Sequence, residues 1–127
     1  NTFGVNYQFS NADSTIILGG YDTSIVANDT LFNWVDLIDK YFWGVETKAV
    51  YYGKENLNLA ANRAILDTGT SLTYFESNDF NKLYAKISKG KECGFSSTTG
   101  FRACRCITEN DFDDLSFQLG GYVSFNC

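Results

Sequence analysis

The chain has 127 residues, of which 44% are hydrophobic and 17% aromatic, a composition that suits one folded domain and excludes a disordered chain. It contains no histidine, which excludes Ser-His and Cys-His nucleophile pairs and histidine-ligated zinc within these residues. The net charge of −5 argues against nucleic acid or an anionic membrane as a partner. No apolar run is long enough to predict a membrane span. Because methionine is also absent, we expect a processed product or a fragment of a longer precursor.

Strand patterns dominate the first part of the chain. Residues 2–10 alternate with a period of two, which predicts a half-buried strand with Phe3, Val5, Tyr7 and Phe9 on one face. A turn cluster at 11–14 and a β-branched strand ending at Gly19-Gly20 complete a predicted hairpin. Further strands are expected over 30–38, over 41–53 with a turn at Gly53, and over 57–69.

One amphipathic helix is predicted near 78–88, because Phe80, Leu83, Tyr84 and Ile87 recur at helical spacing. Ser77 or Asn78 can cap its start, Asp79 lies in its first turn, and Gly90 suits the C′ position. A cysteine-rich loop follows, and then two short strands around Gly120-Gly121. The four lysines of this part of the chain are interpreted as a solvated face: Lys82, Lys86, Lys89 and Lys91.

The chain has an even number of cysteines, which favours disulfides formed in an oxidising compartment. Zinc is the competing interpretation, ranked lower because the C-x-C pair lacks a second such pair or a histidine. Three connectivities are open, among which we favour 93–104 with 106–127. The residues concerned are Cys93, Cys104, Cys106 and Cys127. The sequon at Asn28 is a glycosylation candidate that agrees with a secretory route.

The segment 64–75, AILDTGTSLTYF, presents one carboxylate among small hydroxyl residues. Ile65 and Leu66 predict a buried strand that leads to a turn at Asp67. Gly69 can bring its N–H close to the carboxylate, and the nearby hydroxyl groups can donate to it. Those hydroxyls belong to Thr68, Thr70 and Ser71. Such hydrogen bonds favour the charged form of the carboxylate and fix its orientation.

AILDTGTSLTYF resembles the second active-site motif of pepsin-like aspartic proteases, whose two β lobes each give one Asp-Thr/Ser-Gly loop to a shared cleft. Four other stretches resemble the C-terminal lobe in the same order: TIILGGYDTS, YFWGVETKAVYYG, SNDFNKLYAKI and CITENDFDDLSFQLGGYV. The resemblance implies a mainly β fold of antiparallel sheets with one helix. It also implies that residues 1–127 are a single domain, a partial C-terminal lobe cut at both ends. The family's later aliphatic-aliphatic-glycine strand is not found, and Leu119-Gly120 is assigned to a hairpin instead.

The resemblance implies that Asp67 is one of two catalytic aspartates and that the other lies on an N-terminal lobe. Thr68 would bond to the opposite loop, and Gly69 and Thr70 would hold the Asp67 carboxylate. Thr70, Ser71 and the cleft aromatic Phe42 would contact a peptide or protein substrate. No cofactor and no metal are expected. Without its partner, Asp67 is expected to titrate near the ordinary value of about 3.9.

The expected function is therefore an aspartic endopeptidase of the secretory pathway, secreted or lysosomal/vacuolar, with the isolated chain inactive. One alternative is a catalytically silent module with a binding or structural role. Another, ranked last, is a homodimeric protease of the retroviral type. No catalytic role is given to the other acidic residues of the second half, interpreted as a helix first turn and a solvated loop: Asp79, Asp111, Asp113 and Asp114.

Overall fold

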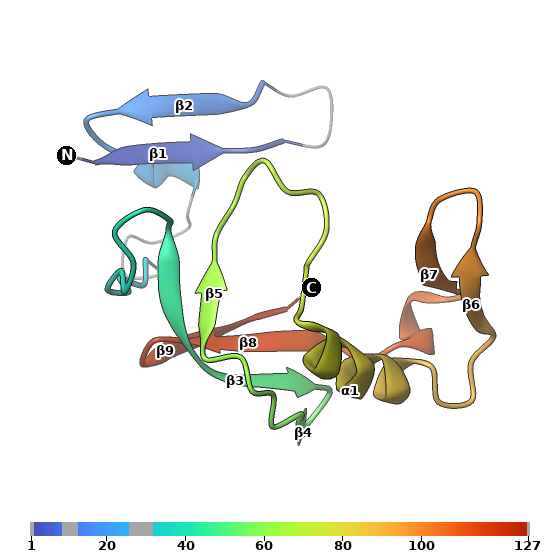
Figure 1. Ribbon diagram of the computed structural model, residues 1–127. Coiled ribbons are helices and arrows are strands. Elements are labelled where there is room, and N and C mark those ends of the chain that lie inside the picture. The colour runs from blue at the N-terminus through green and yellow to red at the C-terminus, as the bar shows by residue number, and fades with distance from the viewer. Residues whose placement is uncertain (1, 9–12, 26–31, 127) are drawn as a thin grey trace. The chain divides into compact units, whose positions relative to one another are not determined.

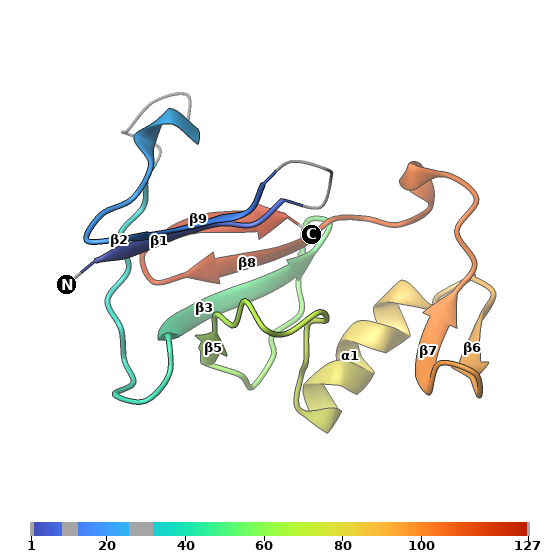
Figure 2. The same ribbon diagram turned by 90° about the horizontal axis from the view of Figure 1, so that it is seen from above.

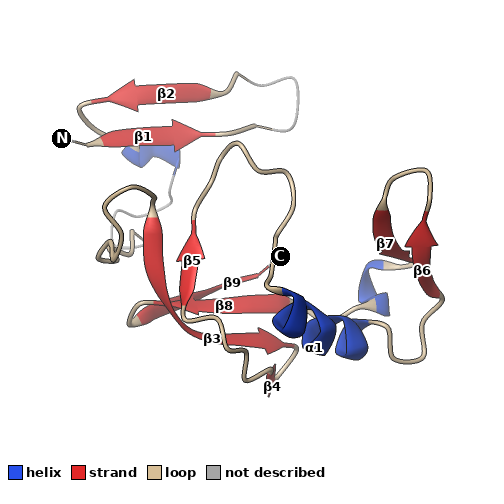
Figure 3. Cartoon of the chain, viewed as in Figure 1, coloured by secondary structure: helices blue, strands red, loops and turns tan. Residues whose placement is uncertain are grey.

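The computed structural model describes residues 2–8, 13–25 and 32–126. The chain divides into two compact units, Asn1–Asn33 and Trp34–Cys127. Antiparallel strands dominate, and the described part of the chain has one α-helix (Figure 1, Figure 3), so the expected fold class is confirmed. Within the described ranges, no helix has the length and apolar character needed to cross a membrane.

The first unit contains the predicted hairpin. Strand β1 (Phe3–Asn6) pairs antiparallel with β2 (Thr15–Leu18), and Gly19 follows β2 with a φ of +87°, which favours glycine. A short 3-10 turn, Thr23–Ile25, comes next. The apolar face of β1 is less covered than its alternation predicts, because Phe3 is 44% and Tyr7 64% exposed. Phe9 and the sequon at Asn28 lie outside the described residues.

The second unit contains a five-stranded antiparallel sheet. Its strands are β3 (Gly44–Tyr52), β4 (Glu55–Asn56), β5 (Arg63–Ile65), β8 (Leu115–Leu119) and β9 (Tyr122–Asn126). The order is β4-β3-β8-β9 (Figure 1), and β5 pairs with the first part of β3 (Figure 2). The predicted glycine turns are confirmed, with φ of +59° at both Gly53 and Gly120. Leu119-Gly120 therefore lies in a hairpin, as expected.

Helix α1 (Ser77–Ile87) packs on the sheet. Val50, Leu57 and Leu83 are buried together, and six partly buried side chains surround them: Tyr52, Leu59, Phe75, Ile87, Leu115 and Phe117. The helix span agrees with the prediction. The predicted caps are wrong: the N-cap is Glu76, one residue before Ser77 and two before Asn78, because its carboxylate accepts the N–H of Asn78 at 2.8 Å. At the other end Ser88 is the C-cap, so Gly90 (φ +71°) follows C′.

The cysteine-rich segment is a hairpin rather than the expected loop. Strands β6 (Cys93–Ser96) and β7 (Phe101–Cys104) pair antiparallel with the two cysteines directly opposite, and a disulfide joins them. This is the first of the two favoured pairs. The exposed Cys106 thiol donates to the carbonyl of Thr108, and Cys127 lies outside the described residues, so the 106–127 pair stays a prediction.

The strand expected over 30–38 is wrong for its described part, 32–38. The segment makes a single bridge, Leu37 to Val45, and is otherwise irregular. The Asp39 carboxylate explains the turn that follows, because it accepts the N–H groups of Tyr41 and Phe42 at 2.8 and 3.2 Å. A side chain that binds its own backbone in this way favours a turn over a continuous strand.

Candidate active site

Strand β5 delivers Asp67 to an exposed turn. Ala64 lies opposite Val45 of β3, and the N–H of Leu66 donates to the carbonyl of Trp43 at 3.0 Å, so the backbone is held by β3 up to the residue before Asp67. The N–H of Thr70 then donates to the Asp67 carbonyl at 3.2 Å and closes the turn. The turn therefore has a defined backbone although its side chains face solvent.

Two donors from the same turn orient the Asp67 carboxylate. Oδ1 accepts the N–H of Gly69 at 2.9 Å, and Oδ2 accepts the Thr70 hydroxyl at 2.5 Å. A Cβ on Gly69 would lie 3.2 Å from Oδ1, so a side chain there would press on the carboxylate. The Thr70 hydroxyl, and after it the Gly69 N–H, hold the pKa of Asp67 below its ordinary value. The expectation that Asp67 titrates near its ordinary value is thus wrong.

The remaining predicted site residues lie on the exposed surface around Asp67. Thr68 and Ser71 are exposed on either side of the bonded pair Gly69 and Thr70. Phe42 is 57% exposed and directly precedes Trp43, whose carbonyl binds the residue before Asp67. Their contacts with a substrate or an opposite loop remain predictions.

The strand before Asp67 is not buried, which corrects the expectation for Ile65 and Leu66. Their side chains are 47% and 54% exposed. The reason is that β5 pairs with β3 alone among the described strands, so its other edge has no partner strand there. Four further large apolar side chains, two before β3 and two after the turn, are also exposed. They are Phe42, Trp43, Leu72 and Tyr74.

Two of the acidic residues interpreted as first-turn or loop residues have specific partners. Asp111 accepts the N–H groups of Ile107 and Thr108 at 2.6 and 3.0 Å, so it organises its own loop instead of being merely solvated. Asp79 is 1% exposed and bonds to backbone N–H groups before β5. Sequence reasoning assigned Asp79 to the helix start alone. Its partners are main-chain N–H groups, which every residue except proline has, so no pattern of side chains in the sequence could have predicted these hydrogen bonds.

Among the described residues, no three His, Cys, Asp or Glu side chains gather as metal ligands.

A family model described as "Eukaryotic aspartyl protease" matches residues 1–125. Vacuolar protease A of Neurospora crassa is 30% identical over 110 residues, which cover 87% of this chain. Embryonic pepsinogen of Gallus gallus is 24% identical over 95% of the chain, and cathepsin E of Aquarana catesbeiana is 28% identical over 94%. These matches span 26%, 30% and 29% of the three relatives' own lengths, so the chain corresponds to less than a third of each.

Proposed function

The chain belongs to the eukaryotic aspartyl protease family, and we propose that it supplies one of the two catalytic aspartates, Asp67, of an aspartic endopeptidase. The observation that carries this proposal is the exposed Asp67 carboxylate, oriented by the Gly69 N–H and the Thr70 hydroxyl. The other aspartate would lie on an N-terminal lobe, on the same precursor or on an associated chain. The exposed apolar side chains around the turn agree with a surface that such a lobe covers.

The proposed chemistry needs both carboxylates. Two like charges held close together cannot both ionise, so the pair shares one proton. The ionised member takes a proton from a water molecule, whose oxygen attacks the scissile carbonyl carbon, while the protonated member donates to the carbonyl oxygen. The C–N bond then breaks as the amine nitrogen receives a proton. Because the shared proton belongs to the pair, the lowered pKa of Asp67 in this chain describes the unpaired carboxylate alone.

Three neighbours of Asp67 would complete its side of the cleft. Thr68, exposed beside the carboxylate, would donate to the opposite loop and hold the two lobes in register. Thr70 and Ser71 would line the cleft next to the scissile bond of a peptide or protein substrate. Phe42, exposed two residues before β3, would contact a substrate side chain.

We also propose a compartment of the secretory pathway for the whole protein. The disulfide between Cys93 and Cys104 requires an oxidising environment for its formation. The relative from Neurospora crassa is named as a vacuolar protease, which agrees with a vacuolar or lysosomal destination as much as with secretion.

Peptide hydrolysis by the natural full-length protein tests the proposal. Asp67→Asn removes the ionisable group with little change of shape, and we expect peptide cleavage at acidic pH to fall by roughly 10²- to 10⁴-fold or more. The matched control is Asp114→Asn, an exposed carboxylate on the loop before β8, which should cleave like the wild type. Equal activity of Asp67→Asn and wild type would overturn the proposal. The 127-residue chain alone, lacking the partner carboxylate, is expected to cleave nothing.

A further inference from the structure

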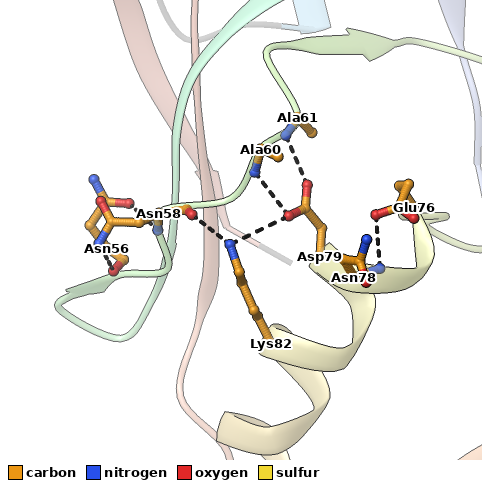
Figure 4. Close-up of polar contacts among 8 residues, drawn as sticks. All are labelled: Asn56, Asn58, Ala60, Ala61, Glu76, Asn78, Asp79 and Lys82. Carbon is orange, nitrogen blue, oxygen red and sulfur yellow. Dashed lines mark hydrogen bonds and ion pairs between the residues drawn. The ribbon is translucent and has the colours of Figure 1, made fainter.

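Asp79 is a buried charge that the proposed chemistry does not use. It lies in the first turn of α1 and is 1% exposed, less than any buried apolar side chain of the core. Oδ1 accepts the N–H of Ala60 at 2.9 Å, and Oδ2 accepts the N–H of Ala61 at 2.8 Å (Figure 4). Both oxygens are therefore satisfied by consecutive backbone donors from the segment that leads into β5.

Lys82, one turn further along the helix, contacts the same segment. Its ammonium group donates to the carbonyl of Asn58 at 3.0 Å and lies 3.9 Å from Oδ1 of Asp79 (Figure 4). We name this set of contacts, made by Asp79 and Lys82 to residues 58–61, the Asp79 latch. It joins one face of α1 to the chain immediately before β5.

The backbone before β5 is shaped to meet this carboxylate. Asn58 has a φ of +47°, a left-handed conformation that asparagine adopts more readily than most residues. The side chain of Asn56 holds it there by accepting the N–H of Asn58 at 2.9 Å. After this bend the Asn58 carbonyl accepts from Lys82, and the N–H groups of Ala60 and Ala61 donate to Asp79 (Figure 4).

The latch closes the loop that carries Asp67. Ala61 and Asp79 are 18 residues apart in the chain, and β5 and the Asp67 turn lie between them. The incoming half of this loop is held by β3, through β5 and the N–H of Leu66. The returning half first contacts the sheet at Phe75, whose ring stacks on that of Phe117 with 6.2 Å between the ring centroids. It is then held by the Asp79 latch. Without the latch, the returning half would lose its polar anchor at the helix start.

We propose that Asp79 is a positioning residue for Asp67, because its carboxylate holds the two ends of the Asp67 loop together. The inference rests on the proposed function insofar as Asp67 is catalytic. The charged state of Asp79 agrees with it: the Ala60 N–H, then the Ala61 N–H and Lys82, lower the pKa of this carboxyl against the opposing effect of burial.

The decisive measurement does not depend on peptide cleavage. In the full 127-residue chain, the pKa of Asp67 is followed by carbon-13 NMR of its carboxyl group, together with hydrogen exchange of the Gly69 and Thr70 amides. In Asp79→Asn, one amide hydrogen faces a backbone N–H, so the latch opens. The Asp67 pKa should then rise toward the ordinary value of about 3.9, and both amides should exchange faster.

Leu83→Ala is the matched control, because it removes a buried side chain from the next turn of the same helix and leaves the Asp79 carboxylate intact. At a temperature where all variants are folded, Leu83→Ala should leave the Asp67 pKa unchanged. If Asp79→Asn does not fold, Lys82→Ala, at an exposed position, replaces it and should cause a smaller shift in the same direction. An unchanged Asp67 pKa in the latch variant, or an equal change in Leu83→Ala, would overturn the inference.

Peptide hydrolysis by the full-length protein separates this inference from the proposed function. If both hold, Asp79→Asn lowers kcat by roughly 10- to 100-fold and leaves KM nearly unchanged, because the carboxylate is displaced while the cleft remains. A wild-type protein that cleaves nothing, with the Asp67 pKa still dependent on Asp79, refutes the proposed function alone. A wild-type protein that cleaves, with an Asp67 pKa independent of Asp79, refutes the latch alone.

Discussion

The Asp67 turn and the Asp79 latch use the same chemistry in opposite settings. Each carboxylate accepts two hydrogen bonds, but Asp67 takes them from residues two and three positions away, whereas Asp79 takes them from residues 18 and 19 positions away. Asp67 is exposed and Asp79 is buried. Local donors can orient a carboxylate without joining distant segments, while distant donors join two parts of the fold. The local donors therefore orient the Asp67 carboxylate directly, whereas the distant donors of Asp79 join the two ends of the loop that carries it.

The largest expected effect is on stability, and it distinguishes the two carboxylates. Asp79→Asn leaves a buried amide group facing a backbone N–H that it cannot accept, so the free energy of unfolding should fall by about 3 kcal/mol. Asp67→Asn alters an exposed group and should leave that free energy almost unchanged. Urea denaturation followed by circular dichroism measures both variants, with Asp114→Asn as a control. An equal loss of unfolding free energy in Asp79→Asn and Asp67→Asn would contradict the claim that only Asp79 stabilises the fold.

The pH dependence of stability should also separate them. The folded-state pKa of Asp79 is lowered, so between that pKa and the unfolded value the unfolded chain binds more protons, and stability rises with pH. The contribution of Asp79 is therefore complete above about pH 4 and lost as the pH falls through the folded pKa. The difference in unfolding free energy between wild type and Asp79→Asn should shrink across this range. A difference that stays constant down to strongly acidic pH would contradict the latch.

A smaller effect concerns orientation at Asp67. Thr70→Val keeps the shape of the side chain and removes the hydroxyl that donates to Oδ2, so the pKa of Asp67 should rise toward about 3.9. Thr73→Val, the same substitution at another exposed threonine, is the control and should leave the Asp67 pKa unchanged. Carbon-13 NMR titration gives both values. A shift caused equally by both variants would show that the Thr70 hydroxyl has no specific role.

The smallest expected effect concerns a polar side chain that, unlike the two carboxylates, accepts neither local nor distant hydrogen bonds among the described residues. The Thr47 hydroxyl is buried in β3, and within the described residues its oxygen has no hydrogen-bond partner. Thr47→Val should therefore raise the free energy of unfolding by about 1 kcal/mol, because a methyl group replaces an unsatisfied hydroxyl. Thr47→Ser, which keeps the hydroxyl and removes only the methyl group, is the matched control and should not raise that free energy. A loss of stability in Thr47→Val would indicate that the hydroxyl has a partner.

Features set by neighbours in sequence could be predicted well. The helical spacing of Leu83 and Ile87 located α1, and the glycines at 53 and 120 located two turns with positive φ. The donors at Gly69 and Thr70 were also expected, because they lie in the same turn as Asp67. In each case the interacting groups are close in the chain, so the pattern itself contains the interaction.

Features set by distant segments could not be predicted. The apolar residues Ile65 and Leu66 predict a strand that is buried against other residues. The pattern does not show whether those other residues belong to this chain, and in the structure both side chains are about half exposed. The partners of Asp79 are main-chain groups of two alanines, whose identity carries no information about a charged neighbour. A carboxylate in a first helical turn is ordinarily a surface residue that favours the helix N-terminus, and here the fold placed it inside.

The use of main-chain donors by the Asp79 latch has a consequence for mutational tolerance. Positions 60 and 61 provide N–H groups and not side chains, so many substitutions there should preserve the latch, whereas proline, which has no N–H, should break it at either position. Position 79 should tolerate almost nothing. A saturation library of this chain would thus show one intolerant position on the helix and two permissive positions on the loop that contacts it. The two sides of the same contact would differ in the substitutions that they tolerate.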